Sequence, residues 1–275
     1  MTTNTITFIG AGNMATSIIG GLIEQGYDNK AITACDPNAS TLDSLSERLG
    51  IQTSTDNGSA CASADVIVLA VKPQILKMVT ENLQTTLSGR QQLPLIISVA
   101  AGISSAQIQQ WLGHPAAVVR CMPNTPALVQ QGASGLYANE QTSTEQKSIA
   151  ESLLQAVGYS TWLDKETLID AVTAVSGSGP AYFFLMMEAM IDAGVRQGLS
   201  KESATQLTLQ TAQGAATLAQ SSDVAVDELR RRVTSPGGTT EQAILSFEEA
   251  GLRTIVDEAM VACAERSKAM ASDFN

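Results

Sequence analysis

The chain has 275 residues, of which 44% are hydrophobic and 16% are charged. It is long enough for one large or two ordinary globular domains, and its composition is too apolar for a disordered chain. Its 16 basic and 27 acidic residues give a formal net charge of −11, which argues against nucleic acid or an anionic membrane as a partner. No uninterrupted apolar run approaches the roughly 18 residues of a bilayer span. No signal peptide is recognisable before the first strand pattern, so we expect a cytoplasmic protein.

Cysteine and histidine usage narrows the chemistry further. The four cysteines, Cys35, Cys61, Cys121 and Cys263, form no CxxC pair, so we expect reduced thiols and no metal site. His114 is the only histidine, and it lies in a Leu-Gly-His-Pro turn with no nucleophile signature nearby. Any catalysis must therefore rely on a cofactor, a hydroxyl, a carboxylate or the backbone.

In chain order, the first part of the sequence alternates between strand-like and helix-like patterns. Short β-branched or fully apolar runs predict strands, and apolar residues at helical spacing predict helices. Strands are expected over residues 5–9, 31–35, 66–71, 93–99 and 117–121, helices over 14–25 and 41–49, and edge strands at 135–138 and 159–163. This rhythm predicts an α/β fold with a doubly wound parallel sheet.

The strand patterns stop near residue 165. Helices are expected over residues 180–197, 203–220, 241–249 and 251–271. Because the segment 203–220 is rich in small residues, which allow close helix packing, we expect it to be buried between other helices or at a subunit interface. The predicted domains are thus an α/β domain, residues 1–165, and an all-helical domain, residues 166–275.

A glycine-rich motif follows the first predicted strand. Gly10-Ala11-Gly12-Asn13-Met14-Ala15 fits the pattern G-x-G-x-x-G/A, between a strand and a helix as that pattern requires. Gly10 permits the tight turn, Gly12 lets the backbone approach a pyrophosphate, and Ala15 lets helix and strand pack closely. Asp36 follows the second strand, where a carboxylate binds ribose hydroxyls. The motif predicts a Rossmann-type dinucleotide site, and Asp36, with no arginine in the four residues after it, leans towards NADH.

Three later loops also follow predicted strands, Ala70-Val71-Lys72-Pro73, Val99-Ala100-Ala101-Gly102 and Cys121-Met122-Pro123-Asn124-Thr125-Pro126. Ligands of open α/β sheets bind beyond the carboxyl ends of the strands, so these small and rigid residues suit the floor of a nicotinamide site. Ordinary strand-to-helix loops have the same composition, so that alternative stays open.

Two motifs in the helical half precede predicted helices. Thr239 and Gln242, in Ser-Pro-Gly-Gly-Thr-Thr-Glu-Gln, fit a capping box, and the glycines before them expose N–H groups suited to a small carboxylate. Ser-Gly-Ser-Gly-Pro-Ala-Tyr, residues 176–182, opens the long helix in the same way, with Pro180 near its first position. A plain capped helix start is the alternative for both. Residues 230–232 are three arginines, which could attract an anionic substrate or form a salt-bridged helix face.

Six segments in this order, FIGAGNMA, LAVKP, SVAAGI, RCMPNTPA, VSGSGPAY and TSPGGTT, resemble the pyrroline-5-carboxylate reductase family across essentially the whole chain. The resemblance implies reduction of the cyclic imine 1-pyrroline-5-carboxylate to L-proline with NADPH or NADH, the last step of proline biosynthesis. It also implies that the helical domain is a dimerisation domain and that the protein is a homodimer or a ring of five such dimers.

The resemblance also implies site residues, position by position. Those expected to hold the dinucleotide are Ile9, Gly10, Ala11, Gly12, Asn13, Met14, Asp36, Asn57, Ala70, Val71, Lys72, Pro73, Val99, Ala100 and Ala101, with Asn57 at the adenosine part. Those expected to bind the substrate are Ser235, Gly238, Thr239 and Thr240. Thr240 matches the catalytic threonine that hydrogen-bonds the ring nitrogen. The family usually carries a lysine in the basic stretch where this chain has Arg231 or Arg232, a change that keeps the charge.

Two alternatives belong to other classes. A β-hydroxyacid dehydrogenase or related imine reductase shares the two-domain plan, but the dehydrogenase pattern places a catalytic lysine at position 183, which is Phe183 here. A dinucleotide-binding regulator without catalysis would retain the glycine loops, and measured turnover would distinguish it.

Overall fold

The computed structural model describes residues 4–272 and divides the chain into two compact units. Of the described residues, unit 1 contains 4–178 and 263–272, and unit 2 runs from Gly179 to Ala262. The domain boundary predicted between residues 165 and 166 stays a prediction. The strands all lie in unit 1 and are β1 Ile6–Ile9, β2 Ile32–Cys35, β3 Gln52–Ser54, β4 Val66–Leu69, β5 Leu95–Ser98, β6 Val118–Met122, β7 Gly132–Ala138 and β8 Gly158–Trp162.

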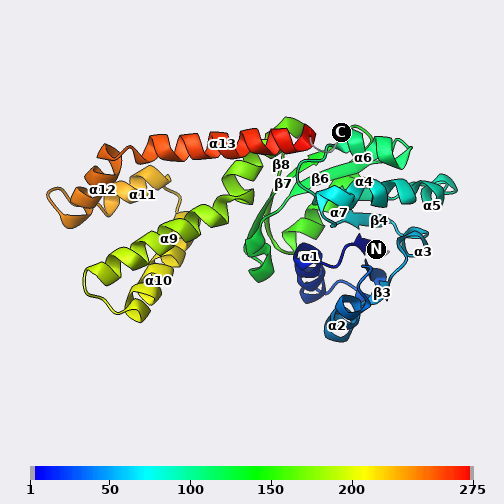
Figure 1. Ribbon diagram of the computed structural model, residues 1–275, viewed down its shortest axis with the longest axis horizontal. Helices are drawn as coiled ribbons and strands as arrows, with labels where there is room; N and C mark the ends of the chain where they lie inside the picture. Colours follow the sequence, from blue (N-terminus) through cyan, green and yellow to red (C-terminus); the bar gives the residue numbers. More distant parts are fainter. Residues whose placement is uncertain (1–3, 273–275) are drawn as a thin grey trace. The chain divides into compact units, whose positions relative to one another are not determined.

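The strands form one eight-stranded sheet with the order β3-β2-β1-β4-β5-β6-β7-β8 (Figure 1). Every described strand pair is parallel except β6 and β7. The order reverses between β1 and β4, which is the switch point where dinucleotides bind in this class of sheet. The predicted doubly wound sheet is confirmed. β3, a three-residue polar strand at the sheet edge, was not predicted.

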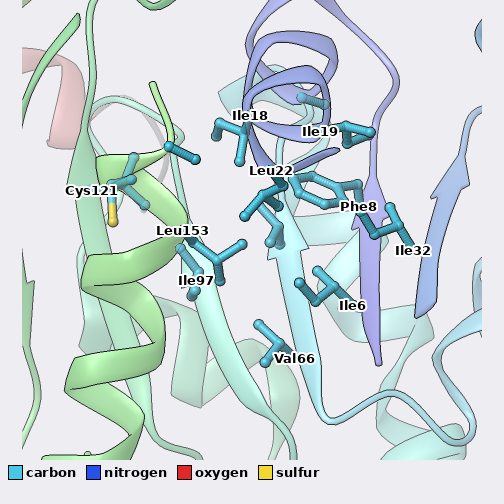
Figure 2. Close-up of a cluster of buried hydrophobic side chains, with 14 of the residues drawn as sticks. Ile6, Phe8, Ile18, Ile19, Leu22, Ile32, Val66, Ile97, Cys121 and Leu153 are labelled. Carbon is cyan, nitrogen blue, oxygen red and sulfur yellow. The ribbon is translucent and has the colours of Figure 1, made fainter. Parts of the chain in front are cut away.

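Helices cover both faces of the sheet. Those of unit 1 are α1 Asn13–Glu24, α2 Ala39–Leu49, α3 Asn57–Cys61, α4 Pro73–Asn82, α5 Gln84–Ser88, α6 Ser105–Leu112, α7 Thr144–Gln155 and α8 Ile169–Val172. One face packs on α1, α2 and α7, where Phe8, Ile19 and Leu153 are among the buried side chains (Figure 2). The other face packs on α3 to α6, around residues such as Ile67 and Leu112. This burial on both faces explains the continuous apolar strands.

Unit 2 consists of helices: α9 Gly179–Arg196, α10 Lys201–Gln220, α11 Val226–Arg232, α12 Thr239–Glu249 and the first part of α13 Leu252–Ser272. Few of its side chains are buried within the chain. The expectation that the segment 203–220 is buried among other helices of the chain is wrong, because α10 buries only Ala204 and Thr208. The subunit interface remains as the second expectation for this helix.

An apolar surface is concentrated on α9. Phe183, Phe184 and Leu185 are 68%, 62% and 67% exposed. The helical stretch Glu166–Arg196 has a mean hydropathy of 1.2 over its most apolar part and is, by length and composition only, long and apolar enough to cross a membrane. Large exposed apolar patches mark association surfaces as well as membrane contacts. Hydropathy alone therefore does not separate the two.

Candidate active site

Four parallel strands end in one row at the carboxyl edge of the sheet. Ile9 pairs with Cys35 on one side and with Leu69 on the other, and Leu69 pairs with Ser98. The backbone bonds continue one residue further, since the N–H of Gly10 donates to the Cys35 carbonyl over 2.8 Å and the N–H of residue 70 donates to the Ile9 carbonyl over 2.8 Å. The loops that begin at residues 10, 36, 70 and 99 therefore start side by side at the switch point.

The glycine-rich loop has the geometry that a diphosphate needs. Gly10 has φ +97°, and a Cβ at this position would lie 2.7 Å from the Ala70 carbonyl oxygen, so a side chain is excluded by both strain and contact. A Cβ on Gly12 would meet nothing within 4 Å, and no side chain caps α1 at this residue. The first turn of α1 thus has no side-chain cap and no Cβ at its N-cap residue, which suits an anion. Ala15 is fully buried, as its predicted packing role requires.

Asp36 and Asn57 lie at the ends of the neighbouring elements. The Asp36 carboxylate accepts hydrogen bonds from the N–H of Ala11 over 3.1 Å and from the N–H of Asn38 over 3.0 Å. Asn57 is partly buried at the first position of α3, after Asp56, whose side chain caps that helix. The side chain of Asp36 is consequently fixed across the glycine-rich loop.

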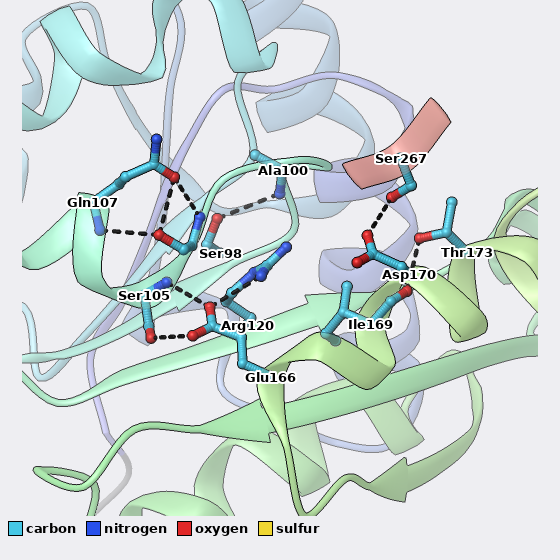
Figure 3. A network of polar contacts seen from close by, with 11 residues as sticks. Ser98, Ala100, Ser105, Gln107, Arg120, Glu166, Ile169, Asp170, Thr173 and Ser267 are labelled. Carbon is cyan, nitrogen blue, oxygen red and sulfur yellow. Dashed lines mark hydrogen bonds and ion pairs between the residues drawn. The ribbon is translucent and has the colours of Figure 1, made fainter. Parts of the chain in front are cut away.

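The loop after β5 is anchored at both ends (Figure 3). At its start, the N–H of Ala100 donates to the buried hydroxyl of Ser98 over 3.4 Å. At its end, Glu166 accepts from the N–H of Ser105 over 2.6 Å and from its hydroxyl over 2.9 Å. Glu166 also accepts from the Arg120 guanidinium over 2.9 Å. The carboxylate thus holds the N-terminus of α6 against β6.

The network around Glu166 was not predicted from the sequence. Arg120 is the one charged residue in the eight strands that the structure describes, and it is 9% exposed. Charged side chains are rarely buried without a partner, so an arginine inside the run Val-Val-Arg-Cys-Met could have indicated a buried ion pair. The identity of the partner could not be deduced, because Glu166 lies 46 residues further along the chain.

A second polar contact joins the loop after β6 to Ser176. Asn124 is buried, and its amide donates to the Ser176 carbonyl over 2.9 Å and accepts from the N–H of Ala133 over 2.8 Å. Ser176 lies in a π-helical turn, Thr173–Gly177, a geometry that is often found at functional sites. Asn124 of the motif RCMPNTPA and Ser176 of the motif VSGSG therefore meet in unit 1.

The Ser-Pro-Gly-Gly-Thr-Thr motif lies in unit 2, at the start of α12. The predicted capping box of Thr239 and Gln242 is wrong, because the helix begins at Thr239 with Gly238 as its N-cap and has no side-chain cap. The loop is closed instead by the Gly238 N–H, which donates to the Ser235 carbonyl over 3.0 Å. Ser235, Thr239 and Thr240 are exposed. An uncapped helix start beside exposed hydroxyls suits a carboxylate better than a capped one.

The three arginines before this motif carry ion pairs. Arg231 pairs with Glu228 over 2.5 Å, Arg232 with the same carboxylate over 3.0 Å, and Arg230 lies 3.9 Å from Glu248. Of the two interpretations, the salt-bridged helix face is the one that matches these contacts.

The histidine and the three buried cysteines all lie in unit 1. His114 lies between α6 and β6, at the edge of the sheet opposite Gly10. Burial raises the pKa of the Cys35 thiol to about 12, with Asp56 and Asp36 adding to the shift. Burial also raises the pKa of Cys61 to about 12. Among the described residues, no group of three or more His, Cys, Asp or Glu side chains is placed to hold a metal ion.

The structure brings the predicted dinucleotide residues of unit 1 to one sheet edge, and it brings the predicted substrate residues of unit 2 to one helix start. Sheet order, switch point and glycine-rich loop together define a dinucleotide-dependent oxidoreductase with a separate helical unit.

Comparisons with known proteins narrow this class. Residues 166–270 match the family model "Pyrroline-5-carboxylate reductase dimerisation", and residues 5–102 match "NADP oxidoreductase coenzyme F420-dependent". A pyrroline-5-carboxylate reductase of Pseudomonas aeruginosa is 56% identical over 274 residues, which cover 100% of this chain and 99% of that protein. The reductase of Pasteurella multocida is 42% identical over 279 residues, with 100% of both chains covered. The chain belongs to the pyrroline-5-carboxylate reductase family.

Solved structures agree. The reductase of Coxiella burnetii superposes with a TM-score of 0.93 at 46% identity, covering 98% of this chain and 99% of that one. The Plasmodium falciparum enzyme, solved with NADP bound, has a TM-score of 0.85 at 31% identity, covering 98% and 99%.

Proposed function

We propose that this chain reduces 1-pyrroline-5-carboxylate to L-proline by hydride transfer from NAD(P)H. The observation that carries the proposal is the 56% identity to a pyrroline-5-carboxylate reductase over the full length of both chains. The dinucleotide loop at Gly10 and the helix start at Thr239 agree with it, because both leave uncapped N–H groups where anions are expected.

The residues proposed to hold the dinucleotide are those at the carboxyl edge of unit 1. Residues 9–14 take the pyrophosphate, Asp36 and Asn57 the adenosine half, and residues 70–73 and 99–101 the nicotinamide half. When bound there, the dinucleotide supplies the hydride. The fixed Ala100 N–H and the part-buried Glu166 contact keep the last of these loops in place.

The residues proposed to bind the imine are Ser235, Gly238, Thr239 and Thr240. The first N–H groups of α12 take the substrate carboxylate, and the Thr240 hydroxyl orients the ring nitrogen. Because a hydroxyl with a pKa far above 7 is a poor general acid, Thr240 does not supply the proton alone. An imine already protonated at nitrogen is electrophilic, so orientation is the main task left to the protein. Good orientation lowers the activation barrier by several kcal/mol, within the roughly 7–11 kcal/mol that well-oriented reactions gain.

The proposed assembly is a homodimer, or a ring of five dimers, in the cytoplasm. The family model over residues 166–270 is a dimerisation model, and α9 presents Phe183, Phe184 and Leu185 to solvent in the single chain. A second copy of this chain is the occupant that accounts for these side chains.

The test is the rate of NAD(P)H oxidation with 1-pyrroline-5-carboxylate, together with detection of proline. Thr240→Val, which keeps the shape and removes the hydroxyl, should lower kcat/KM by about 10²-fold or more, and Thr240→Ser should retain most of it. Thr254→Val, on an exposed face of α13, is the matched control. No turnover from a folded protein that binds the dinucleotide would refute the function. Full activity in Thr240→Val would refute only the role of Thr240.

A further inference from the structure

Asp36 is the acidic group nearest to the place where NADH and NADPH differ. It follows β2 directly, and β2 is in register with β1 so that Cys35 lies beside Ile9 and the glycine-rich loop. In sheets of this order the residue at the end of β2 lies at the adenosine ribose. A carboxylate there accepts hydrogen bonds from the ribose hydroxyls, whereas a 2′-phosphate requires a cation.

The carboxylate of Asp36 is not free to turn away. One oxygen accepts from the N–H of Ala11 over 3.1 Å and the other from the N–H of Asn38 over 3.0 Å. A carboxylate has about four acceptor positions, so two remain for ribose hydroxyls after these bonds are made. Rotation away from a 2′-phosphate would break both backbone bonds, and one of them belongs to the loop that is to hold the pyrophosphate.

The residues around Asp36 provide few groups that could bind the 2′-phosphate of NADPH. The side chain of Asn38 accepts from the N–H of Ser40 over 3.1 Å and from its hydroxyl over 2.8 Å, so the start of α2 is already capped. The sequence from Asp36 to Glu47 contains no Lys or Arg. Asp56 adds a second negative charge, since it acts on the Cys35 thiol together with Asp36.

We propose that Asp36, held by the Ala11 and Asn38 N–H groups, makes this chain bind NADH in preference to NADPH. The inference rests on the proposed function for the dinucleotide class and goes beyond it by naming the dinucleotide and the residue that selects it. The proposed preference for NADH differs from the NADP that is bound in the Plasmodium falciparum relative.

The test is direct binding of NADH and NADPH to the full chain without any imine, measured by energy transfer from protein to nicotinamide fluorescence. Kd for NADPH should exceed Kd for NADH by about 10- to 100-fold in the wild type, from like-charge repulsion and lost ribose hydrogen bonds. Asp36→Ser should bring the ratio to about one or reverse it. Asp43→Asn, which removes one exposed charge from α2, should leave the ratio unchanged.

The ratio of the two Kd values separates selectivity from a damaged loop. If Asp36→Ser merely loosened the glycine-rich loop, both Kd values would rise together and the ratio would stay at its wild-type value. Asp36→Asn retains a side-chain acceptor with less disturbance and should also lower the ratio. Higher salt should narrow the wild-type ratio, because it screens the 2′-phosphate from the carboxylate.

The outcomes distinguish this proposal from the proposed function. Equal or tighter binding of NADPH by the wild type, or an unchanged ratio in both Asp36 variants, would overturn the selectivity and leave the reductase activity standing. Binding of neither dinucleotide by a folded protein would overturn both. Tight NADH binding with no turnover of the imine would support the selectivity and refute the reductase.

Discussion

Glu166 provides the sharpest test of how the predicted nicotinamide loop is held. Its carboxylate accepts three hydrogen bonds, two from Ser105 and one from Arg120, over 2.6 to 2.9 Å. The side chains of Arg120 and Glu166 are 11% and 23% exposed. Replacing Glu166 by Ala removes all three bonds and leaves the arginine charge largely buried without this partner.

The size of the loss follows from burial. Removing one partner of a well-buried ion pair costs about 3–5 kcal/mol. Because Glu166 retains some contact with water, we expect the lower end, about 3 kcal/mol, for Glu166→Ala. Glu166→Gln keeps acceptors for Ser105 and loses the charge, so it should cost about 1–2 kcal/mol.

The free energy of unfolding is measured by urea denaturation at a fixed protomer concentration, with the fluorescence of Trp111 and Trp162 as the signal. A double-mutant cycle of Arg120→Met and Glu166→Gln isolates the pair, with an expected coupling of about 1.5–3 kcal/mol. A coupling under about 0.5 kcal/mol, or a Glu166→Ala variant as stable as the wild type, would refute the reasoning.

A kinetic readout separates positioning from stability. If Glu166 holds the loop after β5, Glu166→Gln should raise KM for the dinucleotide even where the protein is fully folded. Ser143→Ala removes a comparable cap from α7, whose N-terminus lies at the opposite edge of the sheet, and should change stability without changing KM. Equal effects of the two variants on KM would leave no positioning role for Glu166.

Two further predictions concern the glycine-rich loop and the buried cysteines of unit 1. Gly10→Ala should abolish dinucleotide binding in a fluorescence titration, because its Cβ would lie 2.7 Å from the Ala70 carbonyl oxygen at φ +97°. Binding at wild-type affinity would contradict the loop geometry. Burial raises the pKa of the Cys35 and Cys61 thiols from 9.0 to about 12, so the folded protein keeps both thiols neutral where the unfolded chain would ionise them. The folded state therefore has its full stability below pH 9 and loses stability as the pH rises towards 12. Between pH 9 and 12, each thiol lowers the free energy of unfolding by up to about 1.4 kcal/mol per pH unit. Cys35→Ala should therefore make the fall in unfolding free energy over this pH range less steep. An unchanged slope would contradict the raised pKa of Cys35.

Much of the fold could be predicted because its signals are local. A fully apolar run such as Val66–Leu69 can be buried only between two helical layers, and Gly10 and Ala15 fit a strand-turn-helix of fixed spacing. The polar strand Gln52–Ser54 carries no such signal, because an edge strand needs no apolar face. The Ser-Pro-Gly-Gly-Thr-Thr motif was correctly predicted to open a helix, but its cap was not, since Gly238 takes the N-cap position that Thr239 was expected to fill.

The site contacts that escaped prediction are long-range. Glu166 reaches Ser105 across 61 residues, and Asn124 reaches Ser176 across 52. Spacing along the chain contains no information about such pairs; only the folded sheet brings their elements together. The same holds for Asp36, whose position was predicted from the end of β2 but whose two backbone donors were not.

Unit 2 leads to the last prediction, because its helices have little to bury against within one chain. Among the 18 residues of α9, only Gly179 is buried. Full burial of one phenylalanine contributes about 1.5–3 kcal/mol, and a two-fold interface would bury Phe184 twice. Phe184→Asp should therefore weaken association by about 3–6 kcal/mol, or roughly 10²- to 10⁴-fold in Kd.

Sedimentation equilibrium over a range of concentrations measures this loss, and far-UV circular dichroism reports whether the helices of unit 2 persist once the copies separate. Met78→Asp is the matched control, since it introduces the same charge at a residue of α4 that is 57% exposed in unit 1. If the apolar face of α9 is a subunit interface, only Phe184→Asp dissociates the protein, and turnover falls with the dimer fraction. If Phe184→Asp stays dimeric at the wild-type Kd, the apolar face of α9 has another occupant. The expectation that the small residues of α10 pack at a subunit interface would then also lose its support.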